Sequence, residues 1–114
     1  MELIEQFKND LNNIKGNPEY GITTVDIRIN MSRKGTKVYI EFGAKSTAQK
    51  KPLPTFTEAF KNALETFSEH IVYQLKYNRK ELKKAKPEWK YMYERNILNL
   101  TEAKKVAVNY LKKF

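Results

Sequence analysis

A single long amphipathic helix, bounded by prolines, constrains this chain more than any other feature. Pro54 cannot lie inside a helix, because proline lacks a backbone donor and its ring clashes with the preceding turn. Thr55 and Glu58 have the spacing of a capping box, which marks a helix start. Pro87 sets the other limit, because the residue before a proline avoids the α region. We therefore predict one helix over residues 55–86.

One side of this predicted helix is apolar and aromatic. The apolar residues recur at intervals of three and four, the spacing that places side chains on a single helix face. They are Phe56, Phe60, Ala63, Leu64, Phe67, Ile71 and Leu75. We interpret this stripe as hydrophobic core, because a ligand groove would need polar groups to orient a ligand and the stripe contains none.

The residues before the long helix predict a shorter helix and a β-hairpin. Residues 2–15 carry apolar side chains at helical spacing and are followed by Gly16, which favours helix termination. Residues 23–31 and 36–42 alternate between apolar and polar side chains, which is the period of a strand. The expected inward-facing residues are Val25, Ile27, Ile29 and Met31, then Val38, Ile40 and Phe42. Residues 32–35 predict the turn, because Gly35 tolerates positive φ.

The stretch over residues 43–54 has no regular period. Lys45, Lys50 and Lys51 stand there among small polar residues. We expect an exposed loop, since loops of this length are often functional or disordered. A short third strand is the alternative for the same residues.

The C-terminal part predicts further helix. Residues 88–98 have helical spacing, the polar Asn99–Thr101 indicates a boundary, and residues 103–114 form a final amphipathic segment. The predicted fold class is therefore α+β: an N-terminal helix, an antiparallel β-hairpin, a long central helix, and one or two short C-terminal helices. A length of 114 residues predicts a single domain over 1–114.

Several classes of protein are excluded or disfavoured by composition. The chain has no cysteine, which excludes disulfides, thiolate metal sites and a cysteine nucleophile. It shows no secretory signal and no apolar run of the roughly 18–20 residues that a membrane span needs. We therefore expect a cytoplasmic protein that does not enter the membrane.

Positive charge is concentrated in the last third of the chain. The net charge is +9, which favours a polyanionic partner. Residues 1–75 hold ten Lys/Arg and nine Asp/Glu, a net of +1. Residues 76–114 hold twelve Lys/Arg and four Glu, a net of +8. The chain thus divides into a near-neutral α-β-β-α platform and a basic helical end.

No catalytic constellation is evident. The only histidine, His70, lies in the long helix and is interpreted as a boundary residue, so no two-His metal pair exists. The scattered glycines form no phosphate-cradling loop. We therefore expect no enzymatic activity, cofactor or metal. Asp26, Glu41 and Lys45 loosely resemble the pattern of restriction-type nucleases, but Gly43 stands where that pattern has lysine. A metal-dependent nuclease is a third, weaker hypothesis.

The remaining candidate site is the basic C-terminal part of the chain, which also contains several aromatic residues. Lysine and arginine neutralise phosphates, while tyrosine and tryptophan stack on unpaired bases or anchor protein interfaces. The predicted contact residues are Lys76, Tyr77, Arg79, Lys80, Lys83, Lys84, Lys86, Lys90, Lys104 and Lys105. The alternative is a solvated surface whose aromatic residues belong to the core.

We expect the chain to contact nucleic acid or a nucleoprotein complex through these residues. An alternative from a different class is an inhibitor or adaptor that docks on an acidic protein surface. Phages and mobile elements encode such proteins, including ones aimed at a host defence complex. An open hairpin edge would also let two copies pair into a four-stranded sheet, so a homodimer is left open.

Overall fold

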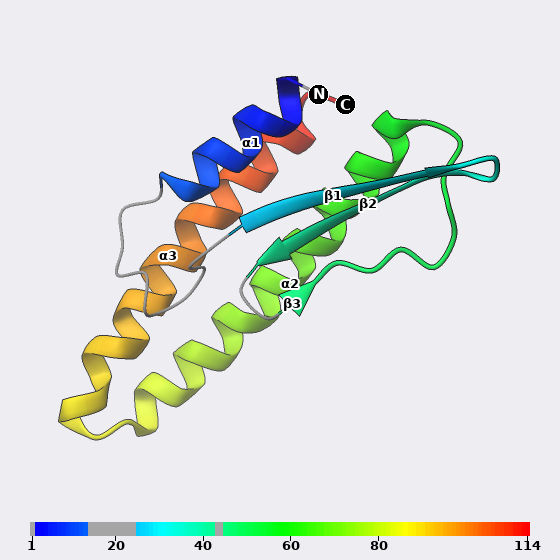
Figure 1. Cartoon of the computed structure of the whole chain (residues 1–114). Helices are drawn as coiled ribbons and strands as arrows, with labels where there is room; N and C mark the ends of the chain where they lie inside the picture. The colour runs from blue at the N-terminus through cyan, green and yellow to red at the C-terminus, as the bar shows by residue number, and fades with distance from the viewer. Residues whose placement is uncertain (1, 14–24, 43–44) are drawn as a thin grey trace.

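The computed structural model describes residues 2–13, 25–42 and 45–114 (Figure 1). Its elements are α1 (Glu2–Asn12), β1 (Val25–Ser32), β2 (Gly35–Phe42), β3 (Lys45–Ser46), α2 (Phe56–Lys84) and α3 (Pro87–Leu111). The predicted α+β fold is confirmed. The predicted end of the first helix at Gly16 lies outside the described residues.

The long helix α2 starts at the predicted cap and ends at Lys84, two residues before the predicted limit. Thr55 is its N-cap, and the Glu58 backbone N–H donates to the Thr55 hydroxyl oxygen at 3.2 Å. This hydrogen bond satisfies one of the backbone donors that the first turn leaves unpaired. Ala85 turns to extended backbone two residues before Pro87, and the helix stops there. The predicted stripe is buried from Phe60 to Leu75, with Phe56 half-buried at its start.

The C-terminal segment is one continuous helix, α3, so the predicted boundary at Asn99–Thr101 is wrong. Asn99 is buried inside the helix rather than at its end. The Thr101 hydroxyl donates to the Ile97 carbonyl one turn earlier, at 2.7 Å. Its polar group is therefore satisfied without a helix break. α3 runs back alongside α2 and also packs against α1 (Figure 1).

The sheet has the order β1-β2-β3, and β1 pairs with β2 in antiparallel register from Val25↔Phe42 to Ser32↔Gly35. Val38 and Ile40 are fully buried, as predicted, in the face of β2 that packs on α2. The inward orientation predicted for Met31 is wrong, because its side chain is 69% exposed. The turn end of the hairpin extends beyond the helices that cover the rest of the sheet (Figure 1). The side chains of Val25 and Phe42 lie outside the described part of the structure.

Residues 45–54 follow the edge of β2. The alternative of a short third strand is confirmed for Lys45–Ser46. The predicted exposed loop is confirmed in part, because Lys50 and Lys51 are exposed but the segment is held against the sheet. Beyond β3, side chains take the place of strand backbone. The Ile40 N–H donates to the Thr47 hydroxyl oxygen at 2.8 Å, and the Val38 N–H donates to the Gln49 side-chain oxygen at 2.9 Å. Thr47 and Gln49 are both buried.

This edge segment is also tied to its neighbours at its far end. Thr36 and Leu53 exchange two backbone hydrogen bonds, at 2.7 and 2.9 Å. The Gln49 side-chain amide donates to the Ala59 carbonyl of α2 at 2.7 Å. Gln49 therefore satisfies backbone groups of the sheet and of the helix with one side chain, which fixes how α2 sits on β2.

Aromatic rings join α1 to the rest of the core. The Phe7 ring of α1 makes edge-on contacts with Phe60, Phe67 and Tyr110, with centroids 5.8, 6.0 and 5.2 Å away. Such edge-to-face pairs are favourable beyond the area they bury. The Tyr110 hydroxyl donates to the Asp10 carboxylate at 2.6 Å, which links α3 to α1.

Substitution of Gly35 should destabilise the fold. Its φ is +133°, and a Cβ placed there would overlap the Leu53 carbonyl group that receives the Thr36 hydrogen bond. We expect Gly35→Ala to lower the free energy of unfolding by about 1–3 kcal/mol or more in urea denaturation. Lys34→Ala, one residue earlier in the exposed turn, should change it by less than about 0.5 kcal/mol. Equal stability of the two variants would contradict this packing.

Tyr110 should make stability depend on pH in the alkaline range. Burial, and then the hydrogen bond to Asp10, raise the pKa of Tyr110 to about 12. In the unfolded chain the Tyr110 hydroxyl loses its proton near pH 10. The contribution of Tyr110 to the free energy of unfolding is therefore fully present below pH 10 and is lost as the pH rises to 12. Urea denaturation across that range should show a steeper loss in the native protein than in Tyr110→Phe. Parallel curves would show that the folded-state pKa is not raised.

Candidate nucleic-acid interface

The ten predicted contact side chains are all exposed, but the structure divides them. Eight lie in the helical tip, which we define as residues 76–98: the end of α2, the connection, and the first turns of α3. Lys104 and Lys105 lie on the returning half of α3, about 21 Å along the helix from Lys90. Lys105 also pairs with Glu102 at 3.2 Å. The helical tip alone is therefore the candidate interface.

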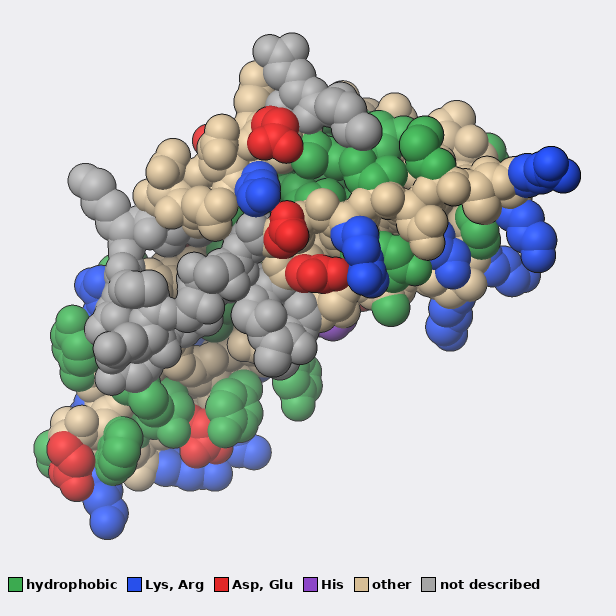
Figure 2. Space-filling model, viewed as in Figure 1, with side chains coloured by type: hydrophobic (Ala, Val, Ile, Leu, Met, Phe, Trp, Pro, Cys, Tyr) green, Lys and Arg blue, Asp and Glu red, His purple; other side chains and the backbone are tan. Residues whose placement is uncertain are grey.

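The cations of the helical tip form a broad ridge on α2. Lys76, Lys80 and Lys83 recur at intervals of four and three, so they share one exposed side of α2, outside its buried stripe. Arg79 follows Lys76 by three residues and Lys84 follows Lys80 by four, so these two cations flank the row on its two sides. Figure 2 shows Lys and Arg side chains at this end of the molecule, beside hydrophobic and acidic ones.

These cations are not neutralised by described carboxylates. The helical tip holds eight Lys/Arg and three Glu, a net of +5. Among the described residues, ion pairs join Lys8 to Asp26, Arg28 to Glu41 and Lys105 to Glu102, and none includes a cation of the helical tip. The positive charge of this end is therefore available to an external anion.

Large aromatic side chains are exposed beside the cations. The exposed fraction is 54% for Tyr77, 54% for Trp89, 59% for Tyr91 and 69% for Tyr73, which precedes the helical tip by one turn. The alternative that these residues belong to the core is wrong for all four. Exposed rings near cations suit contact with unpaired bases or with a protein partner.

A groove between α2 and α3, with a volume of about 380 Å³, lies where the helical tip begins. It is lined by Tyr73, Gln74, Tyr77, Asn78, Met92, Tyr93 and Asn96. At its floor the Asn96 amide donates to the Asn78 side-chain oxygen at 3.0 Å, and the Asn78 amide donates to the Gln74 carbonyl at 2.7 Å. Sequence reasoning missed this groove, because the seven residues come from two helices that only the tertiary fold brings together.

A second basic cluster lies within residues 1–75. Sequence reasoning missed it because the net charge of that segment is near zero. Arg33 and Lys34 occupy the hairpin turn, and the pairing of Thr36 with Leu53 brings the exposed Lys50 and Lys51 close to the same end. We call these four cations the hairpin end. It lies at the opposite end from the helical tip of a molecule 53 Å long (Figure 1). The two dibasic pairs are the sequence signal that would have revealed it.

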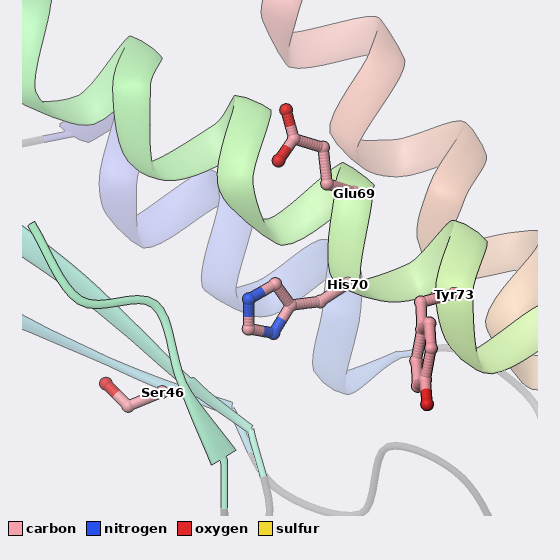
Figure 3. A pocket seen from close by; sticks show the side chains of 4 residues that line it. All are labelled: Ser46, Glu69, His70 and Tyr73. Carbon is pink, nitrogen blue, oxygen red and sulfur yellow. The ribbon is translucent and has the colours of Figure 1, made fainter.

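The only histidine lines a separate cavity of about 490 Å³, together with Ser46, Glu69 and Tyr73 (Figure 3). The Ser46 side chain points away from the His70 ring, and the Glu69 carboxylate points away from it on the other side. Nucleophilic catalysis needs the base to face the nucleophile. This arrangement therefore provides no Ser-His-Glu relay.

The acidic residues of the nuclease hypothesis engage neighbouring cations instead of forming a metal site. Asp26 and Glu41 are directly opposite each other across β1 and β2. Asp26 accepts a hydrogen bond from Lys8 at 3.2 Å, which lowers the pKa of Asp26, and Glu41 lies 3.5 Å from Arg28. Within the described residues, no group of three or more acidic, His or Cys side chains could hold a metal ion.

Comparisons with protein-family models, curated protein sequences and solved structures find no match to this chain. Among the described residues, none of the helices has the length and apolar character needed to cross a membrane. The function must therefore be argued from the surface itself.

Proposed function

We propose that this chain is a non-catalytic nucleic-acid-binding protein that contacts phosphates through its helical tip. The observation that carries the proposal is the net charge of +5 over residues 76–98. Seven of its eight cations are exposed, Arg95 is half-buried, and no described carboxylate neutralises any of them. A protein that places lysines on phosphates releases condensed counterions, and this release drives association.

The type of cation indicates how the nucleic acid is held. Only Arg79 and Arg95 are arginines among the eight cations of the helical tip. Lysine is a flexible point charge, whereas arginine reads base edges through a rigid bidentate fork. The helical tip is therefore suited to phosphate contact that is independent of base sequence.

The exposed rings of Trp89 and Tyr91 also suit a second function, because aromatic residues anchor protein interfaces. In that case the chain would be an inhibitor or adaptor that docks on an acidic protein or on a nucleoprotein complex. Pull-down from lysate with and without nuclease treatment separates the two functions. Capture that disappears with nuclease supports nucleic acid as the partner, and capture of an acidic protein that persists supports the second function.

The direct test compares two variants that remove the same charge. The helical-tip variant carries Lys76→Gln, Lys80→Gln and Lys83→Gln, and the hairpin-end variant carries Arg33→Gln, Lys34→Gln and Lys50→Gln. Fluorescence anisotropy with labelled oligonucleotides should show the helical-tip variant binding roughly tenfold to a hundredfold more weakly at 0.1 M salt. The slope of log K against log salt should fall by about 2, since each phosphate contact on a single strand contributes about 0.7.

The hairpin-end variant should retain most of the affinity. Equal losses in the two variants would show that binding reflects net charge alone, which contradicts a site at the helical tip. Binding whose affinity does not change with salt would contradict phosphate neutralisation, and no binding at low salt would refute the proposed function.

A further inference from the structure

The groove of the helical tip has the composition of a site for a flat aromatic group. Tyr73 and Tyr77 lie four residues apart on α2 and therefore line the same wall, while Met92 and Tyr93 come from α3. The Tyr73 and Tyr77 rings are 69% and 54% exposed, so their faces are accessible from solvent. Rings and a thioether on facing walls can hold a planar ligand between them.

The floor of the groove adds hydrogen-bonding groups. Asn78 is 5% exposed, and its two side-chain hydrogen bonds join it to Gln74 and Asn96. The Asn96 side-chain oxygen is shielded from solvent and has no hydrogen-bond partner among the described residues. A shielded acceptor of this kind is costly unless something donates to it. The floor beneath the rings is therefore polar, with the Asn78 and Asn96 amide groups joined to each other.

The charge around the groove selects the ligand. Among the described residues, the groove lining includes no Asp, Glu, Lys or Arg. Glu81 follows Tyr77 by four residues and lies on the same side of α2, at the end of the groove. Lys84 follows Tyr77 by seven residues and so lies on the same side of α2. The part of a ligand that meets the rings is therefore uncharged, and an anionic part attached to it would lie toward Lys84 and away from Glu81. A nucleobase with its attached phosphates has this distribution of charge.

We propose that the groove receives an unpaired base, so that the helical tip binds single-stranded nucleic acid in preference to duplex. This inference rests on the proposed function. Bases in a duplex are stacked on each other and cannot enter a side-chain groove, whereas unpaired bases stack on tyrosine rings. The lysine ridge holds the phosphates, and the groove between α2 and α3 supplies the preference for single strands.

The test separates bases from phosphates. Oligonucleotides of equal length are compared by anisotropy as single-stranded DNA, single-stranded RNA, blunt duplex, and a single strand of abasic residues. Either base-containing single strand should bind more tightly than the abasic strand and the duplex. The ratio of DNA to RNA affinity then shows which sugar the site favours, since the 2′-hydroxyl distinguishes them.

Variants of one ring provide the matched controls. Tyr77→Leu should weaken binding of the base-containing strand by about fivefold to a hundredfold and leave abasic binding unchanged. Tyr77→Phe keeps the ring and should retain the affinity. Phe114→Leu removes an exposed ring beyond the C-terminal end of α3, outside the helical tip, and should have no effect.

The outcomes distinguish this inference from the proposed function. Equal affinity for abasic and base-containing strands, with the dependence on Lys76, Lys80 and Lys83 intact, would overturn the groove and leave phosphate binding standing. Tighter binding of duplex than of single strands would also overturn the groove and leave phosphate binding standing. No binding to any oligonucleotide at low salt would overturn both.

Discussion

The structure depends on one mismatch of length: α2 is much longer than the sheet on which it packs. Its 29 residues span about 44 Å, whereas the eight residues of β2 span about 26 Å. The part of α2 that includes Phe60 and Phe67 is sealed by the sheet, α1 and α3. Beyond the sheet, α3 is the one described element that packs against α2, so the helical tip has a narrow contact and a large exposed surface. The aromatic side chains and cations there are exposed for that reason.

Much of the fold could be predicted because its signals are local. The Thr55 cap, the prolines and the spacing of apolar residues define α2, and the alternation in residues 25–42 defines the hairpin. The errors arose where tertiary contacts replace local signals. Asn99 and Thr101 resemble a helix boundary, but packing against α2 and a bond to Ile97 keep them helical. Thr47 and Gln49 resemble loop residues, but their side chains complete the edge of β2.

The candidate site, too, could be predicted from the sequence only in part. The exposure of the lysines from Lys76 to Lys90 could be predicted, because a run of cations on an amphipathic helix must face solvent. The separation of Lys104 and Lys105 from that run could not, because it depends on α3 being continuous. The hairpin end and the groove were also missed, since each is assembled from segments that are distant in the sequence. A charge total over a segment describes its composition but not its position on the surface.

The central claim is that the part of the helical hairpin beyond the sheet is the surface that meets nucleic acid. Titration of ¹⁵N-labelled protein with a single-stranded oligonucleotide, followed by backbone amide NMR shifts, tests it most directly. Shift changes should be concentrated in residues 73–98 and should be small at residues 33–34 and 50–51, although the hairpin end is also basic. Changes confined to the hairpin end, or spread evenly over all exposed lysines, would contradict the claim.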